Sequence, residues 1–332
     1  MIKTFHLVYD HIISVENLLG AWREFVRGKR HKRDVQEFEL RLMDNILDLR
    51  RDLVAKKYQH GPYEFFRIND PKPRDIHKAT VRDRLVHHAI YRSLYWFYHP
   101  TFIPDSFSCR LGKGTHRALD RLRTFAYAAS QNHSKTLWVL KCDIRKFFAS
   151  IDQSILFSIF RTRITDPDIL WLLHQVVNSF HSTQVGIGLP LGNLTSQLLV
   201  NVYLNEFDQF VKRELKEKYY LRYADDFVIL SSDKIWLENG LTIIQNFLEN
   251  KLKLQLHPNK ISIKTFASGI DYLGWVHFPD HRVLRTTTKR RMFKRLRESP
   301  STETRQSYLG LLGWGNAKRL REQIIQKQAE KC

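Results

Sequence analysis

Residues 219–231, YYLRYADDFVILS, constrain the fold of this 332-residue chain more than any other stretch. Two apolar, aromatic-rich runs flank Ala224-Asp225-Asp226, the pattern of two strands joined by a tight turn. Adjacent carboxylates on such a turn repel each other and add nothing to a core. We therefore expect the hairpin to hold Asp225 and Asp226 for a functional reason.

A third carboxylate follows another predicted strand. Residues 136–142, TLWVLKC, have the composition of a buried strand and lead directly to Asp143. If this strand pairs beside the hairpin, Asp143, Asp225 and Asp226 converge at one edge of a sheet. Such a cluster needs cations to remain ionised, and hard oxygen ligands suit Mg²⁺. Two Mg²⁺ ions held there would activate a hydroxyl and stabilise leaving pyrophosphate, which is nucleotidyl transfer.

The charge of the chain favours a polyanionic partner. Fifty-four Lys and Arg against 34 Asp and Glu give a net charge of +20, and 12% of the residues are aromatic. Cations that meet phosphates and aromatics that meet bases make nucleic acid the simplest partner, although a protein that merely runs basic remains the alternative. Residues 282–331 hold fourteen Lys or Arg against four Glu, a net charge of +10, and are the best candidate for gripping a duplex backbone.

Cysteines and hydropathy exclude several classes of protein. Cys109, Cys142 and Cys332 are too few and too scattered for a disulfide framework or a zinc knuckle. The N-terminus lacks the unbroken apolar core of a signal peptide, and no apolar run reaches membrane-spanning length. We expect a soluble, cytoplasmic protein with no membrane partner.

Periodicity predicts a mixture of helices and strands. We expect one long amphipathic helix over residues 35–57 and a helix over 81–98 in which His87-His88 forms a packed face rather than a metal site. Asp152 and Asp166 are predicted helix caps. The remaining expectations are a strand at 63–68, a glycine-punctuated turn at 183–190, helices at 192–215 and 241–252, an extended segment at 254–263 and a second hairpin at 266–278.

The motifs together resemble those of reverse transcriptases. Tyr223-Ala224-Asp225-Asp226 is similar to the signature hairpin of that family, and Asp143 within LKCDIRKFFASID is similar to its first catalytic aspartate. The other blocks stand in the family's order: Lys72-Pro73-Arg74, Asp83-Arg84, residues 107–115, LPLGNLTSQ at 189–197, Lys260 in LHPNKISI, and Tyr272-Leu273-Gly274. The resemblance runs from about Tyr63 to Gly274.

This resemblance implies an α+β right-hand polymerase that synthesises DNA on an RNA template. The fingers, with an N-terminal region and part of the palm, would occupy residues 1–135, and the palm, an antiparallel sheet plus helices, residues 136–280. A small, basic, helical thumb would occupy residues 281–332. Because only about fifty residues follow the last motif, we expect no RNase H or endonuclease domain.

The resemblance also implies the roles of individual residues. Asp143 and Asp225 would ligate two Mg²⁺ ions, with Asp226 in support and the Ile144 carbonyl lending an oxygen. Tyr272, Leu273 and Gly274 would form the primer grip against the RNA–DNA duplex.

A further set of residues would contact the incoming dNTP: Lys72, Arg74, Phe148, Leu191, Gly192, Gln197 and Lys260. Lys72 and Arg74 would hold the triphosphate. Phe148 would exclude the ribose 2′-hydroxyl, with a core phenylalanine beside Phe147 as the alternative. Lys260 would act as general acid toward pyrophosphate, or is an ordinary surface lysine.

One departure narrows the resemblance. Most reverse transcriptases have Gln-Gly in the middle block, whereas this chain has Leu191-Gly192 followed by Ser196-Gln197. This pattern is similar to that of the reverse transcriptases of diversity-generating retroelements. Those enzymes copy a template-repeat RNA with frequent errors at adenines for mutagenic retrohoming, and work with an accessory variability protein that forms a basic oligomeric ring. Loss of the Gln amide would loosen the geometry check on the nascent base pair, or would be tolerated without loss of fidelity.

Two other interpretations remain open. The chain could be another bacterial retron-type or defence-associated reverse transcriptase, with a different RNA partner. It could also be a maturase-like RNA-binding scaffold without catalysis, against which the three intact carboxylates argue.

Overall fold

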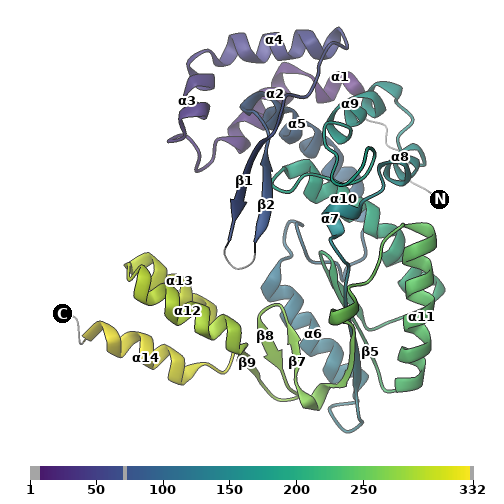
Figure 1. Ribbon diagram of the computed structural model, residues 1–332, viewed down its shortest axis with the longest axis vertical. Helices are drawn as coiled ribbons and strands as arrows, with labels where there is room; N and C mark the ends of the chain where they lie inside the picture. Colours follow the sequence, from purple (N-terminus) through teal and green to yellow (C-terminus); the bar gives the residue numbers. More distant parts are fainter. Residues whose placement is uncertain (1–7, 70–72, 330–332) are drawn as a thin grey trace. The chain divides into compact units, whose positions relative to one another are not determined.

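The computed structural model describes residues 8–69 and 73–329 (Figure 1). The chain divides into two compact units. Unit 1 comprises residues 1–104, 144–214 and 244–255, and unit 2 comprises residues 105–143, 215–243 and 256–332. The three-part division into fingers, palm and thumb predicted from the sequence stays a prediction.

Unit 1 is mainly helical, and its helices pack around α5. This helix, Val81–Tyr98, matches the predicted range and begins at Thr80, whose side chain accepts a hydrogen bond from the backbone N–H of Asp83. It contacts α2 and α10. The other elements of this unit are α1 (Tyr9–Ile12), α2 (Val15–Phe25), α3 (Arg33–Leu40), α4 (Leu42–Val54), β1 (Glu64–Ile68), β2 (Arg74–Lys78), η1 (His99–Thr101), α7 (Phe147–Ser150), α8 (Gln153–Arg161), α9 (Pro167–Val177), α10 (Leu194–Gln209) and η2 (Phe210–Glu214).

The expectation of one helix over residues 35–57 is wrong. The chain leaves helical geometry at Arg41, with φ −124° and ψ 41°, so two helices form in its place. The Asn45 side-chain amide donates to the carbonyl of Phe38 near the end of α3, at 2.9 Å. The break lets α3 bury Val35 while α4 buries a separate apolar face.

The predicted caps and the strand at 63–68 are confirmed. Asp152 accepts from the backbone N–H groups of Ser154 and Ile155 at the start of α8, and Asp166 does the same for the first turn of α9. The helix expected at 192–215 is α10, which continues into the π-helical turn of η2. Strands β1 and β2 pair antiparallel, with Ile68 opposite Arg74.

Unit 2 is built on a four-stranded antiparallel sheet in the order β4-β5-β3-β6. Its strands are β3 (Trp138–Asp143), β4 (Tyr220–Tyr223), β5 (Asp226–Ser231) and β6 (Ser262–Thr265). Helix α6 (Thr115–Ala129) contacts β4 and β5, and its Leu119 and Leu122 share a core with Val139, Val228 and Leu230. The hairpin predicted at residues 219–231 is therefore β4 and β5, and the strand predicted before Asp143 is β3.

A second sheet carries the C-terminal helices. It has the order β7-β8-β9, with β7 (Ile270–Tyr272), β8 (Trp275–His277) and β9 (Arg282–Leu284). Helices α12 (Thr286–Glu298), α13 (Thr302–Leu312) and α14 (Lys318–Ala329) follow it (Figure 1). Trp275, Met292 and Leu312 are buried in the same cluster.

Three boundaries differ from the sequence expectations. Helix α11 (Lys234–Lys251) begins seven residues before the expected start at 241. Within residues 254–263, expected to be extended, Pro258–Lys260 forms the 3₁₀ turn η3, because Pro258 suits the first turn and His257 accepts from the Asn259 N–H. Phe266–Ser268 is a second such turn, η4, so the hairpin expected at 266–278 begins only at Ile270.

No helix in the described part of the chain is long and apolar enough to cross a membrane.

Candidate active site

Two of the predicted catalytic carboxylates face each other across neighbouring strands. β3 pairs antiparallel with β5 so that Asp143, the last residue of β3, lies opposite Asp226, the first residue of β5. Asp225 stands in the turn between β4 and β5, beside Ala224, whose φ of +54° closes the turn. The antiparallel register therefore brings Asp143 and Asp226, 83 positions apart in the sequence, to one end of the sheet.

Ionisation of the Asp226 carboxyl is unfavourable in the folded protein. Burial raises its pKa from 3.8 to about 7, and the charges of Asp143 and Asp225 and a side-chain hydrogen bond with Asp143 act in the same direction. Lys141 opposes them. At pH values below this pKa, Asp226 keeps its proton and shares it with Asp143.

Two lysines stand beside the carboxylates. Lys260 donates from Nζ to Oδ1 of Asp143 at 2.6 Å, and the backbone N–H of His257 donates to the Asp143 carbonyl at 2.7 Å. The η3 turn thus holds Lys260 beside Asp143, with the lysine side chain 38% exposed. Lys141 donates to the backbone carbonyl of Asp271 at 2.6 Å.

Sequence reasoning missed Lys141, although a signal was present. It is the one charged residue within the run TLWVLKC, two positions before Asp143, and alternate residues of a strand share a face. A lysine on the same face as a catalytic carboxylate of a buried strand is a candidate for charge compensation.

The carboxylates fit a divalent cation by their chemistry, although they do not form a ready-made cage. In residues 8–69 and 73–329, no group of three or more His, Cys, Asp and Glu side chains is arranged to hold a metal ion. Lys260 occupies one oxygen of Asp143. A buried and a half-buried aspartate, one with a pKa raised by desolvation and further by the other's charge, are nevertheless a site where a hard cation would replace the shared proton.

A buried arginine supports the hairpin and was also missed. Arg222 on β4 is 1% exposed, and its Nη1 donates to the Ala224 carbonyl in the turn at 3.0 Å. Its backbone exchanges hydrogen bonds with the carbonyl of Asp105 and the N–H of Phe107, both at 2.9 Å. The loop at residues 107–115 therefore lies against β4, and Thr115 donates to the Tyr223 hydroxyl at 3.1 Å.

Tyr272, Leu273 and Gly274 form a tight hairpin turn. Leu273 and Gly274 both have positive φ, +49° and +88°, the pattern of a type I′ turn between β7 and β8. The Tyr272 side chain is fully buried, and its hydroxyl has no hydrogen-bond partner among the described residues. Burial raises the pKa of Tyr272 well above its ordinary value, and the charge of Asp226 adds to this effect.

Unit 1 carries the remaining predicted residues, except Lys72, which lies outside the described residues. Ile144 is buried. Phe148 is half-buried, in edge-on contact with the buried Phe147, and its carbonyl accepts from the Leu189 N–H at 2.8 Å. Arg74 is exposed at the start of β2.

The loop that holds Leu191 and Gly192 is fixed against β2. The Leu191 carbonyl accepts from the His77 N–H at 2.9 Å, and the Asn193 amide donates to the His77 carbonyl at 3.0 Å. Gly192 has φ +109°, and a Cβ there would lie 2.8 Å from Cγ2 of Ile76, so the close approach requires glycine. Leu191 is half-buried, as is Gln197 on the first turns of α10.

A buried polar chain anchors the start of α10. His87, 1% exposed, is hydrogen-bonded through Nδ1 to Thr195 at 2.5 Å and through Nε2 to His60 at 3.1 Å. Burial lowers the pKa of His87 well below its ordinary value, so the ring stays neutral. The predicted packed helix face at His87 is thus also a hydrogen-bonded link to α10.

Asp225 and Asp226 of the hairpin and Asp143 of β3 lie at one end of an antiparallel sheet, and Lys260 contacts Asp143. This arrangement is a candidate nucleotidyl-transfer centre of the polymerase type. The family described as reverse transcriptase (RNA-dependent DNA polymerase) matches residues 68–277. The chain belongs to this family of RNA-directed DNA polymerases, whose members generally use divalent metal ions.

Curated relatives support this assignment. Protein YkfC of Escherichia coli K12 is 25% identical over 291 residues, which cover 76% of this chain and 74% of YkfC. The group II intron-encoded protein LtrA of Lactococcus lactis subsp. cremoris is 24% identical over 318 residues, 74% of this chain and 49% of LtrA. The chain thus spans about half the length of that intron-encoded relative.

A solved structure confirms the fold predicted from the motifs. The apo telomerase from Candida tropicalis, truncated from its C-terminal domain, superimposes with a TM-score of 0.51 at 13% identity, covering 73% of this chain and 60% of that one. At this identity the likeness concerns the fold alone, a mixed helix and sheet polymerase of the right-hand type.

Proposed function

We propose that this chain copies RNA into DNA with Asp143, Asp225 and Asp226 as its catalytic carboxylates and two Mg²⁺ ions as cofactors. Bound at these aspartates, the ions would supply activation of the primer 3′-hydroxyl and charge stabilisation of the leaving pyrophosphate. The observation that carries the proposal is the register of Asp143 against Asp226, together with the raised pKa of Asp226. The substrates would be template RNA, an RNA–DNA duplex and dNTPs.

Lys260 is the proton donor in this proposal. The 3′-hydroxyl gives up its proton to solvent and its oxygen forms a bond to the α-phosphorus, while the bond from that phosphorus to the bridging oxygen breaks. The leaving pyrophosphate keeps the electron pair and takes a proton from Lys260 Nζ. Lys260 Nζ lies 2.6 Å from Oδ1 of Asp143, so an ammonium group is already held at the carboxylates. Arg74, with Lys72, would hold the triphosphate, and Phe148 would select against a 2′-hydroxyl.

We further propose that the chain is the reverse transcriptase of a diversity-generating retroelement. Support comes from Leu191 before Gly192, followed by Ser196-Gln197. The hydrogen bonds of Leu191 and Asn193 to His77 of β2 fix the position of the loop. The Leu191 side chain carries no amide group, so it cannot hydrogen-bond to the nascent base pair and discriminate against a mismatch. Such an enzyme would copy a template-repeat RNA in the cytoplasm and work with an accessory variability protein.

Fidelity opposite adenine tests this assignment. Sequencing of cDNA made on a defined adenine-containing RNA should show frequent errors at adenines for the wild type. Leu191→Gln should lower them several-fold, whereas Leu191→Met, which keeps an aliphatic side chain, should leave them unchanged. Equal adenine error rates in the wild type and Leu191→Gln would show that Leu191 does not cause the errors at adenine.

The relatives favour a second candidate, an intron-type reverse transcriptase. LtrA is a group II intron-encoded protein, and a Saccharomyces cerevisiae relative, 20% identical over 68% of this chain and 33% of its own length, is a putative COX1/OXI3 intron 2 protein. Flanking DNA distinguishes the two, because a diversity-generating element carries a near-identical repeat pair and an intron does not.

A further inference from the structure

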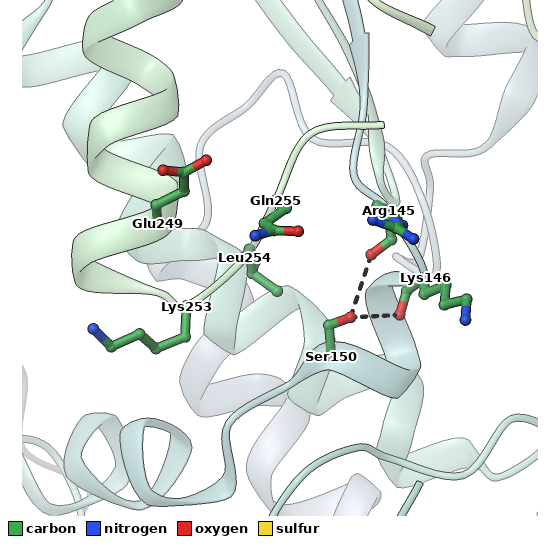
Figure 2. A pocket seen from close by; sticks show the side chains of 7 residues that line it. All are labelled: Arg145, Lys146, Ser150, Glu249, Lys253, Leu254 and Gln255. Atoms are coloured by element: carbon green, nitrogen blue, oxygen red, sulfur yellow. Dashed lines mark hydrogen bonds between the residues drawn. The ribbon is translucent and has the colours of Figure 1, made fainter. Parts of the chain in front are cut away.

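A cavity of about 390 Å³ lies in unit 1. One wall is the segment that begins with Arg145 and Lys146, and the other is the end of α11 and the residues after it, from Glu249 to Gln255 (Figure 2). The Arg145 N–H donates to the Gln255 carbonyl at 2.8 Å, which joins the two walls. Ser150 donates to the carbonyls of Arg145 and Lys146 at 3.3 and 3.2 Å.

The cavity is lined by cations without counterions. Arg145, Lys146 and Lys253 stand against one acid, Glu249, and all four side chains are exposed. None of the four forms an ion pair within the described part of the chain, although each is long enough to reach a neighbour. Figure 2 shows Lys146 and Lys253 extending outward on opposite sides. A net charge of +2 around a concave space favours a small, multiply charged anion.

The cavity adjoins the catalytic strand along the chain. Arg145 follows Asp143 by two residues, so their Cα atoms are at most about 7 Å apart whatever the local conformation. The product that leaves a nucleotidyl-transfer centre is pyrophosphate, a small polyanion. Arg145, which lines the cavity, is therefore held by the chain within about 7 Å of the residue at which that product would form.

We propose that this cavity binds inorganic pyrophosphate on its release from the active site, an inference that rests on the proposed function. Its volume is that of a small-molecule site rather than an extended groove. No aromatic residue lines it, whereas sites for single-stranded nucleic acid combine cations with rings on which bases stack.

Some of the lining residues would bind the anion, and one would favour its release. Arg145 donates charge-assisted hydrogen bonds to phosphate oxygens, and the exposed Lys253 side chain, which extends outward in Figure 2, turns inward to donate another. The Ser150 hydroxyl makes only long hydrogen bonds to the carbonyls of Arg145 and Lys146, so it can rotate and donate to the anion instead. Glu249 repels it, which keeps the affinity low enough for a product to leave.

Calorimetric titration of the full chain with pyrophosphate in EDTA tests the proposal, because EDTA removes any contribution from metal held by the aspartates. The wild type should bind, and Arg145→Gln and Lys253→Gln should each bind roughly fivefold more weakly, as expected for one exposed charge-assisted contact. Glu249→Gln should bind more tightly. Lys251→Gln changes an exposed lysine at the end of α11 that does not line the cavity; it is the matched control and should bind as the wild type does.

A kinetic measurement gives an independent readout. In primer extension, Lys253→Gln should raise the inhibition constant of pyrophosphate several-fold while the KM for dNTP stays within about twofold. These variants change exposed side chains, so circular dichroism should show unchanged folding.

Three results would overturn the proposal: no binding of pyrophosphate to the wild type in EDTA, weaker binding in Glu249→Gln, or unchanged binding in Lys253→Gln. Unchanged pyrophosphate binding in Lys253→Gln beside a lower affinity for template RNA would identify an RNA-phosphate contact instead. The binding arm needs no catalysis, so a wild type that binds pyrophosphate but extends no primer refutes the proposed function alone. A wild type that extends primers but binds no pyrophosphate refutes only this inference.

Discussion

Replacement of Asp226 by Asn should stabilise the metal-free protein at alkaline pH. The folded-state pKa of Asp226 is about 7 against an ordinary value of 3.8. Because one pKa unit corresponds to about 1.4 kcal/mol, ionising this carboxyl in the folded protein costs up to about 4 kcal/mol. The Asn amide avoids that cost and still donates to Asp143, as the protonated carboxyl does.

The sign follows from proton linkage. Between pH 3.8 and about 7 the folded state binds more protons at Asp226 than the unfolded state, so the contribution of this group to stability falls as the pH rises through that window. Because pH 5 already lies about 1.2 units inside this window, urea unfolding in EDTA should show the variant more stable by about 1 to 2 kcal/mol at pH 5 and by about 2 to 4 kcal/mol at pH 8. Mg²⁺ should then stabilise the wild type more than the variant. A variant that is equally or less stable than the wild type at pH 8 without metal would refute the electrostatic reasoning.

Two further substitutions test the lysine and the nucleotide loop. Lys260→Met removes the ammonium group from Asp143, so kcat of primer extension should fall at least about tenfold, with RNA affinity in fluorescence anisotropy unchanged; full activity would exclude a proton donor there. Gly192→Ala should cost about 1 to 3 kcal/mol more in urea unfolding than Gly114→Ala. Both glycines have φ near +108°, so the backbone strain cancels, and only the Cβ at Gly192 overpacks, against Ile76. Equal costs would show that the loop can move away from β2.

Much of unit 2 could be predicted because its signals are local. The alternation and turn residues of 219–231 specify a hairpin, and the β-rich run before Asp143 specifies a strand. That the strand pairs beside the hairpin is only a condition in the sequence argument, because no local pattern specifies which strands are neighbours. The aromatic-rich pattern of 266–278 likewise predicts a hairpin, and the structure places its turn at Leu273 and Gly274.

The features that could not be predicted depend on long-range contacts. The break at Arg41 places two apolar faces against neighbours that no local pattern identifies. The contact of Lys260 with Asp143 joins residues 117 positions apart. The residues that line the cavity come from two segments, 145–150 and 249–255. In a sequence that is basic throughout, no local pattern shows that these cations are unpaired or that they lie close together.

Primer extension on an RNA template with dNTPs and Mg²⁺ tests the central claim most directly. The wild type should extend a DNA primer, and Asp225→Asn should abolish extension while RNA binding is retained. Extension by Asp225→Asn at the wild-type rate would contradict the assignment of the catalytic carboxylates, and a wild type that binds RNA but extends no primer would show the chain to be an RNA-binding scaffold.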